Sequence, residues 1–145
     1  MNERTKQSMA VKLSPDQKQA TIKEWQAQVK QLLGQVETWA KEQGWEVART
    51  KTKIQEFELP PYNTQSLEIR IADKTRAHLE PIARFTLNGK GVVELYGWPG
   101  LRRVRLQPAK TNGALTWIVM TDSGIPLHQP WNAENFYILV NDLVA

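Results

Sequence analysis

An apolar stripe with helical spacing occupies the first third of the chain. Its members follow one another at intervals of three or four residues, which places them on one face of a helix. Ser14 suits the N-cap, Pro15 the first helical position, and Gln17 can close a capping box. A helix is therefore predicted from residue 14 to Gln43, with Gly44 as its C-terminal cap. The stripe consists of Ile22, Trp25, Val29, Leu32, Val36 and Trp39.

A narrow stripe of this kind is either the seam of a coiled coil or the cover of a sheet. We favour the second interpretation, because the strands predicted downstream need an apolar cover.

From Trp45 the apolar period changes to two, which is typical of strands. Residues 45–58 are mostly polar, as expected of a long strand or a bent pair near an edge. Residues 60–65, PPYNTQ, are predicted to be a loop, because two prolines do not fit within a ladder. Further strands are predicted at 66–72, 77–85, 92–98 and 101–107, with turns at 73–76 and 87–91. Pro81 indicates an edge position or a bulge.

The last third of the chain predicts one more strand and a second helix. Asn112 and Gly113 predict a turn, and the segment after it, residues 114–121, is the most apolar strand. We therefore expect this strand to be central. Asn132 suits the N-cap of a helix. The apolar face of that helix carries Phe136, Leu139, Val140 and Leu143.

The order of these elements predicts an α+β fold. Strands joined by short turns pair antiparallel, because parallel pairs need long crossovers. We expect a two-layer sandwich with a long N-terminal helix, an antiparallel meander sheet of five to six strands and a short C-terminal helix. Residues 1–13 are predicted to be a flexible tail, and residues 14–145 a single domain.

The hairpin at residues 95–106, LYGWPGLRRVRL, is the segment most suggestive of a binding site. With Pro99 and Gly100 at the centre of a type II turn, its apolar residues all fall on one face. A register shifted by one residue would mix arginine into that face. The chosen register places Glu94 opposite Arg105 and Tyr96 opposite Arg103.

Outward residues of the neighbouring strands join this hairpin on the water-facing side of the sheet. The candidate binding residues there are Arg70, Arg84, Tyr96, Trp98, Arg103 and Arg105, accompanied by Glu68, Glu80, Glu94 and His78. One interpretation is a solvated surface of ion pairs and a cation–π pair. A second is a nucleic-acid site, in which arginines neutralise phosphates and aromatic rings stack on bases. A third is a protein interface, since tryptophan and arginine are enriched at hot spots.

Charge and composition refine this picture. The 145-residue chain has a net charge of +4 and no cysteine. Residues 66–110 hold nine basic and four acidic side chains, so the basic excess includes the candidate surface. The absence of cysteine excludes disulfides and thiolate metal sites, and it favours a cytoplasmic location. No apolar run is long enough to span a membrane or to act as a signal peptide.

Few patterns in the chain point to catalysis. No phosphate-binding loop or nucleophile elbow is present in the sequence. His78 and Glu80 share a strand face and could act as an acid–base pair, and Asp122, Ser123 and His128 could be part of a triad. We interpret the first pair as solvated and the second group as a turn.

The sequence thus predicts a small binding or accessory protein, not an enzyme, with no catalytic residues, metal or cofactor. We expect a monomer or dimer that binds DNA or RNA. The alternative is a protein-binding adaptor, chaperone or immunity-type module that uses the same face or the long helix.

Overall fold

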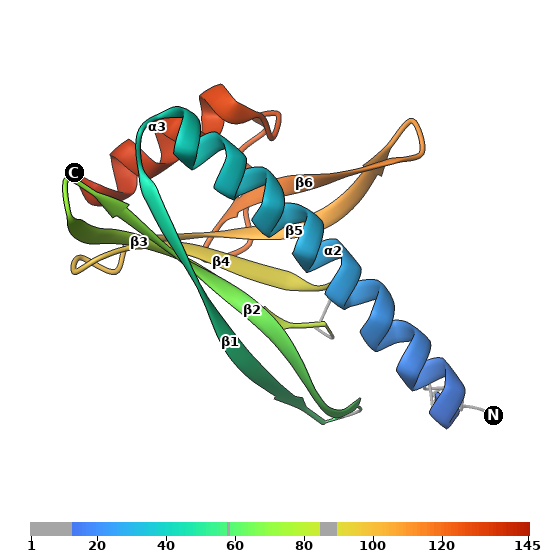
Figure 1. Cartoon of the computed structure of the whole chain (residues 1–145). Coiled ribbons are helices and arrows are strands. Elements are labelled where there is room, and N and C mark those ends of the chain that lie inside the picture. Colours follow the sequence, from blue (N-terminus) through green and yellow to red (C-terminus); the bar gives the residue numbers. More distant parts are fainter. Residues whose placement is uncertain (1–12, 58, 85–89) are drawn as a thin grey trace.

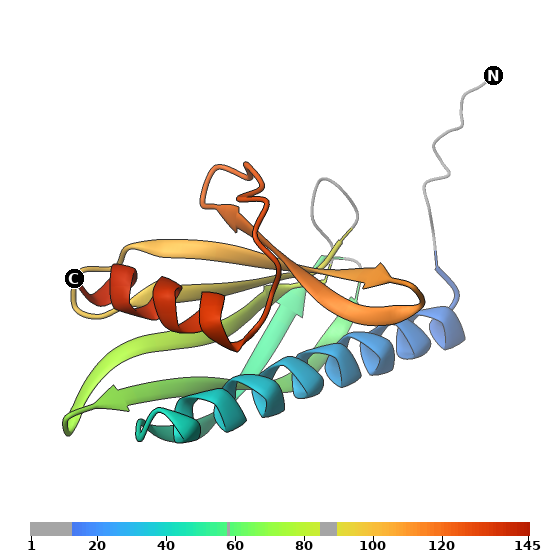
Figure 2. The ribbon, with the colours of Figure 1, turned by 90° about the horizontal axis from the view of Figure 1, so that it is seen from above.

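The fold is an α+β sandwich in which two helices cover one face of an antiparallel sheet, as predicted (Figures 1 and 2). The computed structural model describes residues 13–57, 59–84 and 90–145. The predicted tail, except Leu13, and residues 87–89 of the predicted turn lie outside these ranges. The sheet has six strands in the order β1-β2-β3-β4-β5-β6, every neighbouring pair being antiparallel. The elements are α2 (Pro15–Glu42), β1 (Glu46–Glu56), β2 (Leu59–Ile71), β3 (Lys74–Ala83), β4 (Val92–Gly97), β5 (Arg103–Thr111), β6 (Ala114–Thr121) and α3 (Ala133–Val144).

Helix α2 begins and ends where its capping residues predict. The Ser14 side chain accepts from the Gln17 backbone, and the Gln17 side chain accepts from the Ser14 backbone, which completes the capping box. Gly44 has a φ of +78°, the left-handed conformation of a helix C-terminal cap. The predicted stripe packs against the sheet, so the sheet-cover interpretation is confirmed. Leu33 and Ala40 are also buried and widen it.

The predicted loop at residues 60–65 is wrong, because these residues belong to β2. Pro60 and Pro61 stand at the start of this strand, opposite a register irregularity between Ile54 and Glu56 of β1. The pairing of β2 with β3 reaches only to Leu67, so among the described residues the prolines have a neighbouring strand on one side alone. Proline is tolerated at such positions, because no ladder hydrogen bond is lost.

The turn predicted at residues 73–76 is displaced. Ile71 pairs with Lys74, which leaves Ala72 and Asp73 as a two-residue loop. Both have positive φ, 52° and 65°, as a type I′ hairpin turn requires. Neither is glycine or asparagine, so the usual signal for this turn was missing. The turn predicted at Asn112 and Gly113 is confirmed, with Thr111 opposite Ala114.

Strand β6 lies at the edge of the sheet, so its predicted central position is wrong. Its apolar composition reflects burial on the core face and, at Met120, on the opposite face as well. Trp117 and Val119 face the core, whereas Met120 is buried where the chain folds back and pairs it with Pro126. The folded-back loop thus supplies the cover that we had attributed to a neighbouring strand.

The β4–β5 hairpin has the predicted register but a different turn. Tyr96 pairs with Arg103, and the Gly97 N–H donates to the Arg102 carbonyl at 2.8 Å. The positive φ falls at Leu101 (62°) and not at Gly100, and the Trp98–Pro99 peptide bond is cis. The Leu101 N–H donates to the Gly97 carbonyl at 3.0 Å. A longer connection closes the hairpin without the splay that a two-residue type II turn imposes.

Helix α3 docks through an aromatic cluster. The Asn132 side chain accepts from the Asn135 N–H, as its predicted N-cap role requires, and the four predicted apolar residues are buried. Phe136 is fully buried, and its ring centroid lies 5.7–6.1 Å from the centroids of four neighbouring rings. These rings belong to Trp39, Trp45, Trp131 and Tyr137. The cluster fastens α3 to both the end of α2 and the start of β1.

Candidate functional site

The open face of the sheet carries two rows of polar side chains across its central strands. Strand pairing aligns Glu68, His78, Tyr96 and Arg103 in one row. The same pairing aligns Glu80, Glu94 and Arg105 in the next row. Directly opposite residues of antiparallel strands lie about 5 Å apart, so side chains within each row are in contact range. The register therefore brings together most of the predicted site.

The arginines of this face are paired with its glutamates. Arg103 Nη1 lies 3.0 Å from Glu94 Oε1, and Arg105 Nε lies 3.8 Å from Glu94 Oε2. Arg70 Nη1 lies 3.5 Å from Glu68 Oε2, which also accepts from the Thr75 hydroxyl. Exposed ion pairs contribute little stability, about 0–1 kcal/mol each. Their consequence here is electrostatic: the positive charge of the face is largely compensated.

Three rings form a contiguous aromatic group at the hairpin end of this face. The rings of His78 and Tyr96 stack with centroids 5.0 Å apart, and the Trp98 ring meets His78 edge-on at 5.9 Å. The Arg103 guanidinium lies 5.7 Å from the Tyr96 ring centroid, which confirms the predicted cation–π pair. The Tyr96 ring is therefore in contact with both His78 and Arg103, whereas Trp98 remains 45% exposed.

Burial raises the pKa of Tyr96 to about 12, and the Glu80 carboxylate that accepts its hydroxyl proton at 2.7 Å acts in the same direction. The folded chain holds this proton above pH 10, where a tyrosine in the unfolded chain loses it. The stability that Tyr96 contributes by keeping its proton should therefore be fully present below about pH 10 and be lost between about pH 10 and 12. Urea unfolding midpoints across this range should decline less in Tyr96→Phe than in the wild type. Equal declines would contradict the prediction.

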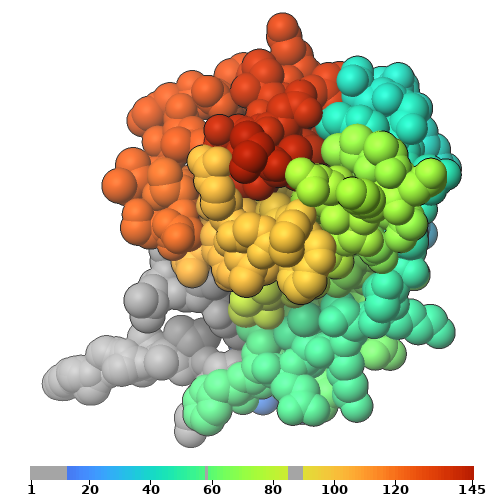
Figure 3. All heavy atoms as spheres, turned by 90° about the vertical axis from the view of Figure 1, so that its left-hand side faces the viewer, coloured from blue at the N-terminus to red at the C-terminus, as the bar shows by residue number. Residues whose placement is uncertain are grey.

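The position of Trp98 is held from two sides. Its backbone N–H donates to the Arg76 carbonyl at 2.8 Å, and Arg102, at the other end of the same turn, donates from Nη1 to the Asp142 carbonyl at 2.9 Å. Figure 3 faces this end of the molecule, where the β4–β5 turn (yellow-orange) lies on the surface beside the C-terminal end of α3 (dark red). An exposed tryptophan is thus presented on a turn that is tied to the rest of the fold.

Arg76 and Arg102 have a structural role that the sequence analysis missed. Arg76 Nη2 donates to the Val144 carbonyl at 2.8 Å, and Arg102 Nη2 lies 3.2 Å from Asp142 Oδ2. The last carbonyls of a helix lack partners within it and carry partial negative charge. Helix α3 has no basic residue in its own last turn, so Arg76 of β3 and Arg102 of the β4–β5 turn supply the two cations. No local sequence pattern signals contacts across such long separations.

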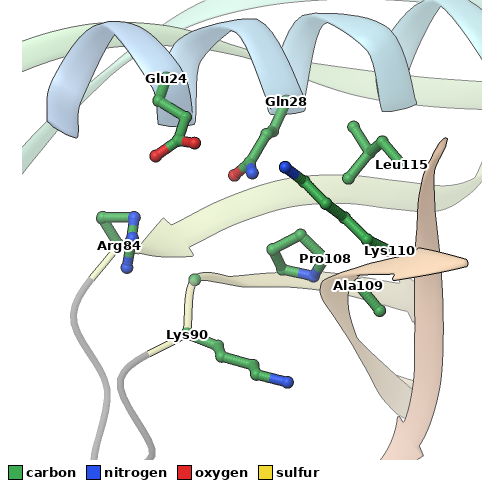
Figure 4. Close-up of a pocket in the computed structure, with 9 residues that line it drawn as sticks. Glu24, Gln28, Arg84, Lys90, Pro108, Ala109, Lys110 and Leu115 are labelled. Carbon is green, nitrogen blue, oxygen red and sulfur yellow. The ribbon is translucent and has the colours of Figure 1, made fainter. Parts of the chain in front are cut away.

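Arg84 does not join the open face, which corrects the predicted site. A bulge at Pro81, predicted as one of two possibilities, shifts the register between Pro81 and Ala83. Arg84 instead lines a cavity of about 260 Å³ with Glu24, Gln28 and Lys110 on the helix side of the sheet (Figure 4). A one-residue shift reverses which face a strand residue occupies, and this explains the difference.

The residues considered for catalysis are engaged in other contacts. Glu80 accepts from Tyr96, and His78 stacks on the same ring. The Ser123 and Thr121 hydroxyls lie 3.0 Å apart within the turn after β6. Among the residues that the structure describes, no cluster of three or more histidines and carboxylates could hold a metal ion. Neither helix in this part of the chain is long and apolar enough to cross a membrane.

Comparisons of the chain with protein-family models, with curated proteins and with solved structures found no match.

Proposed function

We propose that this chain is a non-catalytic binding protein that recognises another protein through the hairpin end of its open face. The surface concerned consists of His78, Tyr96, Trp98, Leu101 and Arg103, and is named the Trp98 patch below. The observation that carries the proposal is an exposed tryptophan on a braced turn, beside Leu101, which is 46% exposed. Aromatic and arginine side chains held in place before binding are typical of interface hot spots, because little side-chain entropy is lost.

Charge favours a protein partner over a nucleic acid. Nucleic-acid affinity depends on cations that neutralise phosphates. The arginines of the open face are instead balanced by Glu68, Glu80 and Glu94. Binding a phosphate chain would require these ion pairs to be exchanged, whereas a protein surface can accommodate them at the rim of an interface.

Single-stranded DNA or RNA is a second candidate ligand, favoured by one specific observation. Trp98 presents an exposed ring at the end of an open antiparallel sheet that also carries Arg103, and such a surface can stack a base and contact a phosphate. The residues that would contribute are Arg70, Tyr96, Trp98, Arg103 and Arg105. A cytoplasmic location, expected from the cysteine-free sequence, is part of both proposals.

A Trp98→Ala variant tests the first proposal directly. We expect the immobilised wild-type chain to retain a specific protein from a lysate of its source cells at both low and high salt. Trp98→Ala should weaken that binding about tenfold or more, as loss of a hot-spot residue does. Ile138→Ala is the matched control, because Ile138 is an exposed apolar residue outside the patch, on α3. Retention that is equal in Trp98→Ala would overturn the proposal.

A titration with short oligo(dT) and oligo(rU), followed by tryptophan fluorescence, tests whether the chain binds single-stranded nucleic acid. Saturable quenching that falls steeply with salt and is lost in Trp98→Phe would support a nucleic-acid ligand. Absence of quenching at low salt would exclude it.

A further inference from the structure

The helix side of the β1–β2 hairpin differs in charge from the open face of the sheet. Arg49 of β1 donates from Nη1 to Gln65 Oε1 at 3.0 Å and lies 2.7 Å from Glu37 of α2, so its side chain is on the helix side. Alternate residues of a strand share a face, which places Lys51 and Lys53 on the same side as Arg49. Both lysines are exposed. The hairpin, which extends along α2 in Figure 1, thus adds two lysines to the surface beside this helix.

Helix α2 adds two more lysines on the side that meets the hairpin. The Gln26 side-chain amide donates to the Asn63 carbonyl of β2 at 2.6 Å. Lys23 and Lys30 lie three residues before and four residues after Gln26, so they share its side of the helix. Lys30 lines a cleft of about 170 Å³ between α2 and β2. Lys53 pairs with Asn63, which lines the same cleft, so lysines from the helix and from the hairpin border it together.

The charge of these four lysines is not compensated as that of the open face is. In the part of the chain that the structure describes, none of the four forms an ion pair. Glu37 lies beside them, but its carboxylate is already held by Lys41 at 2.9 Å and by Arg49. The group is named the lysine surface below and consists of Lys23, Lys30, Lys51 and Lys53.

We propose that the lysine surface binds the phosphate backbone of a nucleic-acid duplex. Lysine side chains that neutralise phosphates release bound counterions, and this gives affinity for any base sequence. A duplex carries one negative charge per roughly 1.7 Å of its axis, and Lys23 and Lys30 lie about 10 Å apart along α2. Each lysine can therefore meet a different phosphate.

The composition of this surface favours a duplex over a single strand or a protein. Proteins that bind single strands of any sequence combine cations with aromatic rings on which the bases stack. None of the described residues that line the cleft is aromatic. A duplex keeps its bases stacked inside, so contacts to its backbone are sufficient for binding. Lysine is also depleted in protein–protein interfaces, which argues against an acidic protein as the occupant.

The salt dependence of duplex binding tests the proposal. A fluorescently labelled DNA duplex of about 20 base pairs is titrated with the full chain between about 50 and 200 mM NaCl, and anisotropy reports the affinity. Four lysine contacts predict a slope of about −3.6 for the logarithm of affinity against the logarithm of salt concentration, which is about a 150-fold loss across this range. The Lys51→Ala/Lys53→Ala variant should halve the slope to about −1.8, and Lys53→Ala alone should give about −2.7. A single strand of the same length should bind more weakly than the duplex.

Lys74→Ala is the matched control, because Lys74 is also exposed but lies at the β2–β3 turn, at the opposite end of β2 from the cleft. This variant should keep the wild-type slope, and all variants should keep the wild-type circular dichroism spectrum. Trp98→Ala should bind the duplex as the wild type does, so this proposal and the protein-binding proposal can fail separately. The lysine surface is excluded as a duplex site if the wild type binds with a dissociation constant above about 100 µM at about 50 mM NaCl. An equal loss of slope in Lys74→Ala and Lys53→Ala, or equally tight binding of the single strand or of poly-glutamate, would also overturn the proposal.

Discussion

A Gly97→Ala substitution should destabilise the protein by about 3 kcal/mol, because it drives a side chain into the backbone of α3. A Cβ atom at Gly97 would lie 2.2 Å from the Leu143 carbonyl oxygen and 2.9 Å from its carbon. Backbone at this distance cannot rotate aside as a flexible side chain could. The end of α3 would have to move away from β4, and the hydrogen bonds of Arg76 and Arg102 to the end of this helix would then be lost.

Urea unfolding of Gly97→Ala measures this effect, and Gly100→Ala is its control. Gly100 lies in the turn of the same hairpin, and a Cβ there would meet nothing within 4 Å. Its replacement should change the free energy of unfolding by about 0.5 kcal/mol or less. If both variants unfold at the wild-type urea concentration, the close approach of α3 to Gly97 is contradicted.

Local patterns predicted the helices and the β4–β5 register well. Capping residues marked both ends of α2, and burial of one apolar face left a single acceptable register for the hairpin. The same patterns did not reveal which strand lies at an edge. Alternation reports which face of a strand is buried, whereas the number of neighbouring strands depends on the whole topology. The apolar β6 was therefore predicted to be central, although a returning loop covers part of it.

The candidate site was predicted only in part, because some of its contacts also depend on the whole topology. Tyr96, Arg103 and Arg105 fall where alternation and register predict. Arg84 does not, because the exact site of a bulge depends on packing around Pro81 that no local rule specifies. The capping role of Arg102 depends on α3, whose C-terminal end follows it in sequence by 40 residues. Contacts of that range leave no periodic signal.

The second large effect is expected for Phe136→Ala, which should cost about 3–5 kcal/mol of the free energy of unfolding. Phe136 is fully buried, and removing its ring opens a cavity between four other aromatic rings. Large neighbouring indoles cannot collapse into that space without leaving their own contacts. Urea unfolding followed by tryptophan fluorescence reports the loss, because Trp39, Trp45 and Trp131 surround the site.

Ile138→Ala provides the control for Phe136→Ala. Ile138 lies on the same helix but is 56% exposed, so its replacement should cost less than about 1 kcal/mol. If Phe136→Ala also loses less than about 1 kcal/mol of the free energy of unfolding, the aromatic cluster does not fasten α3 to the rest of the fold. The Gly97→Ala and Phe136→Ala variants both weaken the docking of α3, from opposite ends of the helix. Their double variant should therefore lose less stability than the sum of the two, since a helix that has already lifted cannot lose the same contacts again.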